Sequence, residues 1–370
     1  MKSPSMEKRI ESAVLMNIKR YSIVKNMFEI AEAWLDRHNI KNSTSLISQW
    51  FYTQKLTEIE SKDFVVPSVP SVPAASSEIK SNSELKDSLL KYRLTEPQIA
   101  LFENLLHQMC LYFHSSPNPP TYGFDSVTTQ IVKRNKQNWF QLTCQSFTFV
   151  LNEDIYQKLV NSNKDFGNGY NINTRIFNLI CRYNTLKDKG YHQALLPATF
   201  QVLKNHLKIN HELFASPFNN ILDSYTSMYP DTDSFFGSKG NFFEVHSQLF
   251  KNGGSFQAHP PAIRPVISAF LNVILEVLKK KPAVSFALFL PGGVMKTSHH
   301  FLKELEYNIL PQKYLVLRYE NYALADFYCS ISSRIKTAKH DLYVYILQNE
   351  AGRKLFPMGT TFEEDLNGSF

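Results

Sequence analysis

The sequence has no long apolar run and no recognisable targeting segment at its start. Its longest apolar stretches, such as residues 283–290, are far shorter than the roughly 20 residues that span a bilayer, so we expect no membrane span. The first residues, Met-Lys-Ser-Pro, lack the charged and then apolar regions of a secretory signal peptide. The sequence therefore favours neither a membrane protein nor a secreted one.

Cysteine is scarce, and several easily recognised catalytic motifs are missing. The 4 cysteines follow neither a zinc-ligand spacing nor a disulfide framework and suit a reducing compartment; they are Cys110, Cys144, Cys181 and Cys329. No Asp, Glu or Cys accompanies His259, His299 and His300 at a ligand spacing, so we predict no metal site. The chain also lacks a nucleophile-elbow motif and a glycine-rich phosphate loop of the P-loop type. These absences argue against zinc enzymes, serine hydrolases and P-loop nucleotidases.

What the sequence does contain is an excess of positive charge, on a chain long enough for two or three domains. Its 370 residues carry a net charge of +7, and 43% of them are hydrophobic, which is ample for buried cores. A basic chain can bind a polyanion by releasing counterions, but many proteins of this charge never contact nucleic acid. Charge alone therefore leaves nucleic-acid binding open.

Helical spacing dominates the first part of the chain. Apolar residues recur at helical intervals over residues 5–58, with a break at 38–45, and we predict a helical extension over 1–64. Three prolines spaced three residues apart predict an extended Pro/Ser linker over 65–80. A mostly helical domain is predicted over 81–212. Its elements are helices at 85–111, 173–183 and 197–207, with one or two strands within 131–150.

A basic cluster in this region stands beside aromatic residues. Lys133, Arg134 and Lys136 precede Trp139 by a few positions. This combination can hold phosphate groups and stack a base, as single-stranded nucleic-acid sites do. The same residues also fit a solvated turn that leads into a core tryptophan, so both interpretations remain open.

After residue 212 the pattern changes to strands that alternate with helices. A helix is predicted at 263–281, and strands are predicted at 242–245, directly before residue 259, at 284–290, at 314–318 and at 342–347. This alternation predicts an α/β sheet with crossovers in a domain of residues 213–360, followed by a tail of 361–370. Ligands of such sheets lie outside the carboxyl ends of the strands. We therefore expect residues 214–219, 259–262 and 291–293 to lie on one rim.

The stretch at residues 253–262 carries the most specific motif. A short strand is followed by His259, Pro260, Pro261 and Ala262, and then by the amphipathic helix. Methyltransferases that act on amino groups build the lip of their site in this way, usually with Asn, Asp or Ser before the two prolines and an aromatic residue after them. Two prolines between a strand and a helix also make a plain turn, because proline is welcome at the first helical position.

Three segments give the chain a family likeness. They read Phe-Ala-Ser-Pro-Phe-Asn at 214–219, Pro-Asp-Thr-Asp followed by Phe-Gly-Ser-Lys-Gly within 230–240, and Gly-Ser-Phe-Gln-Ala-His-Pro-Pro at 254–261. In order and spacing they resemble the phosphorylated-CTD-interacting-factor family. Members of that family are cap-specific adenosine N6-methyltransferases, which act on the 2′-O-methyladenosine beside the messenger RNA cap.

The resemblance implies a Rossmann-type methyltransferase domain packed on a helical domain, with S-adenosylmethionine in one pocket and capped RNA in the groove. By position, His259, Pro260, Pro261 and Ala262 stand where the family has its Asn-Pro-Pro-Phe catalytic motif. The donor-pocket residues implied in the same way are Phe214, Ser216, Pro217, Asn219, Asp231, Phe236 and Gly237. Animal members carry an N-terminal WW module, which this sequence does not display, so binding to the polymerase tail is not implied.

The changed motif decides how much activity to expect. A neutral imidazole offers a single acceptor nitrogen in place of the asparagine amide, and Ala262 removes the ring that would stack on the base. The favoured hypothesis is a methyltransferase-fold protein with weakened or lost catalysis, which binds RNA, the donor, or a catalytic partner through residues 5–58. One alternative is an active adenosine N6-methyltransferase in which Phe256, Tyr229 or Phe236 stacks instead; another is a different transfer or a chance likeness. Messenger-cap chemistry points to the nucleus, or to the cytoplasm if the chain is viral.

Overall fold

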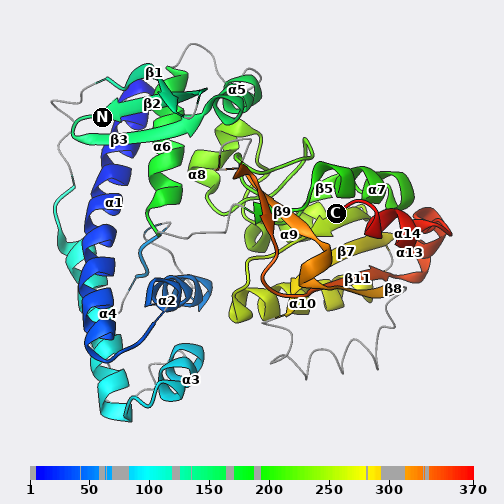
Figure 1. Cartoon of the computed structure of the whole chain (residues 1–370), viewed down its shortest axis with the longest axis horizontal. Coiled ribbons are helices and arrows are strands. Elements are labelled where there is room, and N and C mark those ends of the chain that lie inside the picture. The colour runs from blue at the N-terminus through cyan, green and yellow to red at the C-terminus, as the bar shows by residue number, and fades with distance from the viewer. Residues whose placement is uncertain are drawn as a thin grey trace. The chain divides into compact units, whose positions relative to one another are not determined.

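The chain divides into two compact units. A computed structural model describes residues 6–41, 43–57, 63, 65–68, 83–118, 126–134, 136–163, 171–186, 193–280, 282–292, 313–327, 329 and 333–370. The first unit comprises Met1–Ile131, Gln141–Val150 and Tyr170–Lys189, and the second comprises Val132–Phe140, Leu151–Gly169 and Gly190–Phe370. Figure 1 labels the elements of both. The predicted boundaries of the extension, linker and domains stay predictions.

Helices make up most of the described part of the first unit. They are α1 (Met6–Arg37), α2 (Ser43–Thr57), α3 (Ser83–Lys91), α4 (Glu96–Ser115) and α6 (Ile172–Asn184). The two helices predicted within residues 5–58 are confirmed. The single helix predicted at 85–111 is instead two helices, because Arg93 adopts a φ of 64° and Thr95 with Pro97 begins α4.

Helix α1 is the centre of this unit and contacts α2, α4 and α6 (Figure 1). Its apolar face is buried, with Val14, Val24, Phe28 and Leu35 all 0% exposed. Helices of the same chain therefore already cover the faces on which we had expected a catalytic partner to bind. A partner subunit held by the apolar faces of residues 5–58 is not supported.

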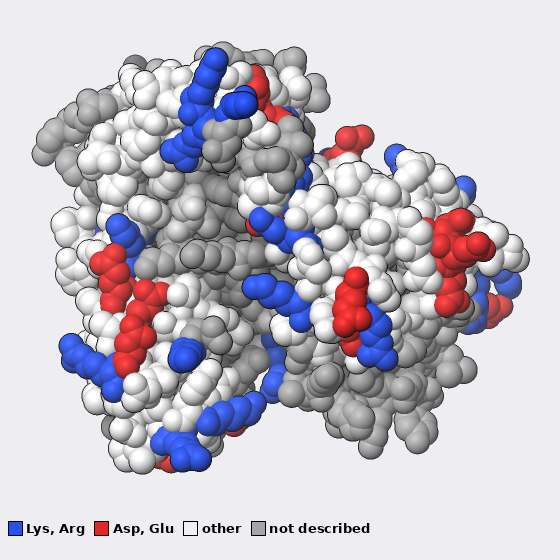
Figure 2. All heavy atoms as spheres, in the orientation of Figure 1, with Lys and Arg blue, Asp and Glu red and all other residues white. Residues whose placement is uncertain are grey.

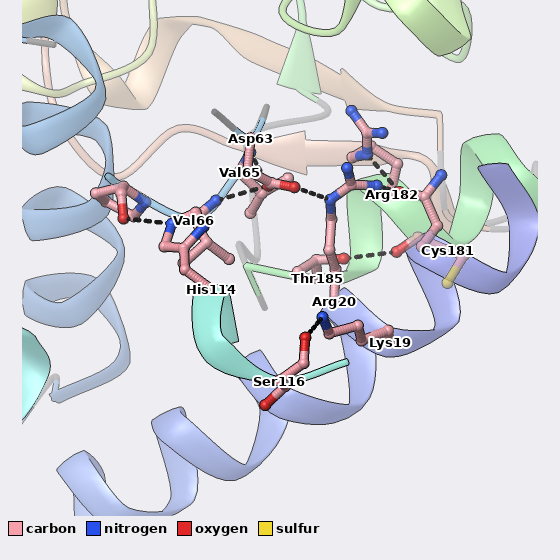
Figure 3. A network of polar contacts seen from close by, with 12 residues as sticks. Lys19, Arg20, Asp63, Val65, Val66, His114, Ser116, Cys181, Arg182 and Thr185 are labelled. Atoms are coloured by element: carbon pink, nitrogen blue, oxygen red, sulfur yellow. Dashed lines mark hydrogen bonds and ion pairs between the residues drawn. The ribbon is translucent and has the colours of Figure 1, made fainter. Parts of the chain in front are cut away.

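A buried ion pair fastens the segment after α2 to α1 (Figure 3). Arg20 Nε donates to Asp63 Oδ2 at 2.7 Å, and Asp63 Oδ1 accepts from the backbone N–H groups of Val65 and Val66 at 2.9 and 3.0 Å. Burial alone would raise the pKa of Asp63, but the Arg20 charge and these backbone bonds outweigh it and lower the pKa. The start of the predicted linker is thus fixed to α1, while its residues 69–80 lie outside the described residues.

A three-stranded sheet follows α4, and its residues are divided between the two units. In sheet order its strands are β1 (Thr128–Arg134), β2 (Gln137–Cys144) and β3 (Phe147–Asn152), which confirms the strands predicted here. Helix α5 (Glu153–Ser162) of the second unit begins directly after β3, where the Asn152 side chain accepts from Ile155 N at 3.0 Å. Phe140 of β2 stacks on Tyr156 of α5, with ring centroids 3.8 Å apart.

The second unit is built on a mixed five-stranded sheet with the order β5-β6-β7-β11-β8. Its strands are β5 (His211–Glu212), β6 (Gly254–Ala258), β7 (Val284–Pro291), β8 (Lys313–Leu317) and β11 (Leu342–Gln348). Strands β5, β6 and β7 run parallel, and β11 is antiparallel to both β7 and β8. A smaller sheet has the order β10-β9-β4, with β4 (Gln193–Ala194), β9 (Ala323–Asp326) and β10 (Ile335–Thr337). The predicted α/β fold is confirmed.

The other described elements of this unit are helical. They are α7 (Pro197–Leu207), α8 (Pro230–Asp233), η2 (Ser234–Phe236), α9 (Phe242–Leu249), α10 (Arg264–Leu278), η3 (Tyr319–Asn321), α13 (Glu350–Leu355) and α14 (Phe362–Asn367). The helices predicted at 173–183, 197–207 and 263–281 are thereby confirmed as α6, α7 and α10. Among the helices that the structure describes, none is long and apolar enough to cross a bilayer.

Helices cover both faces of the sheet (Figure 1). In β7, Phe286 and Leu288 pack in one apolar cluster with α9 and α10, whereas Ala287 and Phe289 pack in another with α7 and α14. Side chains of a strand alternate between faces, so a strand buried on both sides reads as one continuous apolar run. That run made β7 predictable, and it places the sheet between two layers of helix.

The strand predicted at residues 242–245 is wrong, because this segment forms the start of α9. Asn241 caps the helix by accepting from Phe243 N at 3.0 Å. Phe242, Val245 and Leu249 are more covered than the exposed residues between them and recur at helical spacing. A short apolar run does not by itself distinguish a strand from a helix, and here the cap and the three-and-four spacing decide for the helix.

Candidate functional site

The carboxyl ends of β5 and β6 lie side by side at one edge of the sheet. Glu212 pairs with Gln257 in the parallel register, so both strands end at the same edge, as β7 does beside them. The segments 214–219 and 259–262, which follow these strands, were predicted to share this rim, and the strand directions place them there. Of the third predicted rim segment, 291–293, Pro291 ends β7 and Gly292 follows it, whereas residue 293 lies outside the described residues.

A narrow pocket opens at this edge. It is lined by Gln193, Ala194, Leu195, Phe200, Glu212, Phe214, Asn219, Gln257 and His259. Three of the residues singled out in the sequence, Phe214, Asn219 and His259, are therefore brought together from separate segments. The space that it encloses is about 10 Å³, room for about one water molecule, so a base or S-adenosylmethionine would bind here only after the walls move apart.

His259 directly follows the carboxyl end of β6 and is half-buried. Its surroundings favour the uncharged form of the imidazole. Burial lowers the pKa of His259 to about 4, so the imidazole is uncharged near pH 7. No hydrogen bond holds its ring nitrogens within the part of the chain that the structure describes. A neutral ring has one acceptor nitrogen and one N–H donor, and both remain available to a ligand.

The two prolines after His259 shape the lip of the pocket. Pro260 is buried, Pro261 is half-buried, and Ala262 is exposed. The carbonyl of Pro261 accepts from Ile263 N at 2.7 Å in a tight turn, and α10 begins at the next residue. Because Ala262 faces solvent, a larger side chain has room there.

The wall formed by residues 214–219 is a hydrogen-bonded turn. Asn219 Oδ1 accepts from the backbone N–H and the hydroxyl of Ser216 at 2.7 and 2.9 Å, and Asn219 N donates to Ser216 O at 3.1 Å. Ser216 is thus occupied within the turn, and Pro217 is buried. Neither lines the pocket, whereas the flanking Phe214 and Asn219 do.

The other implied donor residues belong to a neighbouring turn. Asp231 lies in the first turn of α8, Phe236 is buried and its carbonyl accepts from Tyr225 Oη at 2.8 Å, and Gly237 has a φ of 97°. None of the three is among the residues that line the described pocket. This positive φ favours glycine, so the backbone of the turn explains the residue at position 237.

Two charged residues beside the pocket, buried Glu212 and half-buried Lys158, were not singled out from the sequence. Glu212, at the end of β5, is 2% exposed, and burial raises its pKa to about 7. Burial lowers the pKa of Lys158, on α5, to about 8, although the Glu212 charge opposes this shift. Glu212 lies two residues before the likeness segment 214–219, and that closeness was its one sequence signal; the position of Lys158 had none.

The predicted nucleic-acid residues lie on the β1–β2 hairpin. Lys133, Arg134 and Lys136 are exposed, and the Arg134 guanidinium lies 5.8 Å from the ring centroid of half-buried Trp139. Figure 2 shows basic side chains gathered over this end of β1 and β2. Trp139 is thus covered on one side by Arg134, and these residues do not line the pocket.

Comparison with known proteins supports the family resemblance. The family model described as "Phosphorylated CTD interacting factor 1 WW domain" matches residues 152–326. Two relatives, from Homo sapiens and Mus musculus, are named mRNA (2'-O-methyladenosine-N(6)-)-methyltransferase. Each is 28% identical over 188 residues, which cover 48% of this chain and 26% of the relative.

The chain is similar to these methyltransferases. It spans about a quarter of their length, since the aligned part is 26% of each relative. The matched range contains the pocket, α5 and most of the sheet of the second unit, but none of the 3 tryptophans of the chain. The expected lack of a WW module and the altered motif stay predictions.

Among the described residues, no group of three or more His, Cys, Asp or Glu side chains is placed to hold a metal ion. His299 and His300 lie outside the described residues. The chemistry of the pocket is therefore that of neutral hydrogen-bonding groups, one buried carboxyl and aromatic rings.

Proposed function

We propose that the second unit is a methyltransferase-like domain of Rossmann type that binds capped RNA and whose methyl transfer is weakened or lost. The pocket at the carboxyl edge of β5 and β6 carries this proposal, because it joins His259 to Phe214 and Asn219 from the likeness segments. The similarity to mRNA methyltransferases supports RNA as the partner. Because these relatives are named for messenger RNA, the similarity also supports residence in the nucleus.

The residues of the lip support binding more strongly than transfer. The acceptor nitrogen of His259 can take one hydrogen bond from an exocyclic amine, but the imidazole reaches farther than an asparagine amide, and a misplacement of about 1 Å can cost on the order of a hundredfold in rate. Exposed Ala262 offers no ring, and the stacking it forgoes is worth roughly 1 to 3 kcal/mol. Both changes act on the substrate base.

S-adenosylmethionine is the usual donor of such enzymes and, when bound, supplies the methyl group. Phe214 and Asn219 remain our candidates for contact with it, together with Ser216, Pro217, Asp231, Phe236 and Gly237.

The first experiment measures donor binding and transfer separately. The protein is titrated calorimetrically with S-adenosylmethionine and S-adenosylhomocysteine, and methyl transfer to capped RNA beginning with 2′-O-methyladenosine is followed with radiolabel. We expect little or no transfer by the wild type and a gain in His259→Asn/Ala262→Phe. Efficient transfer by the wild type would refute the loss of catalysis and establish an active adenosine N6-methyltransferase.

We further propose that the β1–β2 hairpin contacts the RNA backbone. Helix α5 holds the hairpin through Phe140 stacked on Tyr156, and the same helix contacts the turn that forms the pocket wall, since Lys158 Nζ donates to Asn220 O at 2.7 Å. Residues 128–152 contain basic residues but no Asp or Glu. The strands of the hairpin therefore offer positive charge to an RNA bound at the pocket, while the nearest acid, Glu153 of α5, accepts from Asn138 Nδ2 at 3.2 Å.

Salt dependence tests this contact. The variant Lys133→Gln/Arg134→Gln/Lys136→Gln is expected to bind capped RNA more weakly and to reduce the slope of log K against log salt by about 2, at roughly 0.7 per phosphate contact. The control removes equal charge from exposed lysines elsewhere: Lys25→Gln/Lys204→Gln/Lys354→Gln. Equal losses of affinity for capped RNA in both variants would show that the overall positive charge attracts the RNA, and would refute a site on the hairpin.

A further inference from the structure

A half-buried lysine holds one end of the pocket wall by its backbone carbonyl groups. Lys158, on α5, donates from Nζ to Phe218 O at 3.2 Å and to Asn220 O at 2.7 Å. Both carbonyls belong to the turn that presents Asn219 to the pocket. A lysine ammonium has three donors and no acceptor, so it can bind the loop through carbonyl oxygens alone.

A buried glutamate holds the next part of the same loop by its N–H groups. Glu212 Oε1 accepts from Ile221 N at 2.6 Å and from Leu222 N at 2.5 Å. Glu212 is itself one of the residues that line the pocket. The Lys158 amino group therefore binds two carbonyl oxygens of the loop, and the Glu212 carboxyl group binds two of its N–H groups.

The helix that carries Lys158 is anchored on its other side. Asn152, which caps α5, donates from Nδ2 to Phe327 O at 3.1 Å and to Cys329 O at 2.8 Å. Asp154 of α5 is paired with Arg334. The charged groups that act on Lys158 are Glu212, Arg334 and Asp154, and the one that acts on Glu212 is Lys158.

We propose that Lys158 and Glu212 are positioning residues, which hold residues 216–222 as the fixed wall of the pocket and so set its affinity for ligand. The effect on ligand rests on the proposed function of the pocket, whereas the effect on the loop does not. Charged groups held away from water are weak sources of net stability, because desolvation offsets their favourable contacts. The clearest consequence here is geometric, since four backbone groups of the loop are hydrogen-bonded to two side chains.

We call Lys158 and Glu212, with the four backbone hydrogen bonds that they make to the loop, the clamp. Hydrogen exchange of peptides within residues 213–222 tests the clamp without any ligand. In Lys158→Met, whose side chain has similar length and no donors, we expect protection of this segment to fall at least tenfold, with little change in β6. Lys204→Met is the matched control, because Lys204 is an exposed lysine of the same unit. Unchanged protection of 213–222 in a folded Lys158→Met protein would overturn the proposal.

The wild type provides a second test that does not depend on a variant folding. After correction for intrinsic exchange, protection of residues 213–222 should fall as pH rises through about 8, where Lys158 loses its proton, while β6 shows no such step. A purely apolar contact of α5 would not move with pH. The neutral amine keeps two N–H donors but forms weaker bonds than the ammonium, so the fall should be smaller than in Lys158→Met, and protection that rises from pH 8 to 9.5 would contradict the clamp.

Ligand binding then separates the clamp from the function of the pocket. Affinity for a 2′-O-methyladenosine cap analogue is measured at pH 7.5 in wild type and Lys158→Met, and we expect a loss of about tenfold. If the loop loosens but the wild type binds no cap analogue, the clamp stands and the proposed function fails. If the wild type binds and Lys158→Met binds equally well, the positioning role fails.

Discussion

Replacing Glu212 by glutamine should change how the stability of the second unit depends on pH. Glu212 is 2% exposed, and burial raises its pKa from 4.5 to about 7. Between these values the folded state binds more protons than the unfolded state, so wild-type stability rises as pH falls from 7 to 4.5. At about 1.4 kcal/mol per pKa unit, this gain amounts to about 3 kcal/mol. A glutamine side chain does not titrate and has no such gain.

The neighbouring His211 acts in the opposite direction over nearly the same range. It is 3% exposed, its Nδ1 lies 2.8 Å from Ser224 Oγ, and burial with the nearby charge of Lys239 lowers its pKa from 6.5 to about 4. The unfolded state binds more protons here, so this stability is present above pH 6.5 and is lost as pH falls toward 4. The loss is also about 3 kcal/mol. In the wild type the two contributions offset each other.

The Glu212→Gln variant should therefore lose stability on acidification where the wild type does not. Native-state hydrogen exchange of peptides from β6 and β7, at pH 7.5, 6.5, 5.5 and 4.5, reports opening of the second unit by itself. We expect the difference in opening free energy between the two proteins to change by about 3 kcal/mol across this range. Half of that change should occur by about pH 6.

An exposed carboxylate on the same unit provides the control for this measurement. Glu244→Gln removes a carboxylate from an exposed position on α9 and should follow the wild-type pH dependence. If Glu212→Gln also follows it, then Glu212 is ionised throughout the range, and the reasoning from its burial is wrong. A parallel His211→Asn variant should show the reverse behaviour and gain stability toward pH 5.

Three further substitutions test the packing of each unit. Gly352→Ala should destabilise the second unit by about 3 kcal/mol or more, because a Cβ there would lie 2.0 Å from the Val284 carbonyl oxygen; an unchanged melting temperature would contradict this. Phe286→Ala should cost about 3 to 5 kcal/mol in urea unfolding, since this ring is 0% exposed; a cost below 1 kcal/mol would mean that the core can collapse around it. Arg20→Met should lower exchange protection of α1 by about 3 kcal/mol or more, because it leaves Asp63 buried without its cation, and β7 should be unaffected.

Local patterns predicted several of the elements near the site and missed others. The helical spacing and initial proline of α7 gave its bounds, and the continuous apolar run of β7 marked a strand buried on both faces. The same reasoning failed at α9, where a short apolar run is compatible with either structure and the Asn241 cap decides. Strands β4, β5, β9 and β10 were missed, because they are too short to show a period, and helix α5 was not predicted.

By itself the sequence determined the strand, double-proline turn and helix around His259, because those conformations depend on neighbouring residues: the prolines restrict φ, and α10 shows its own apolar period. Only the tertiary structure decided which residues share the pocket, and that Lys158 reaches the carbonyls of a loop about 60 residues away in the chain. It also decided the pKa values of Glu212, His211 and His259. The physical reason is that desolvation depends on which distant segments pack around a charge, and no local pattern of residues encodes that packing.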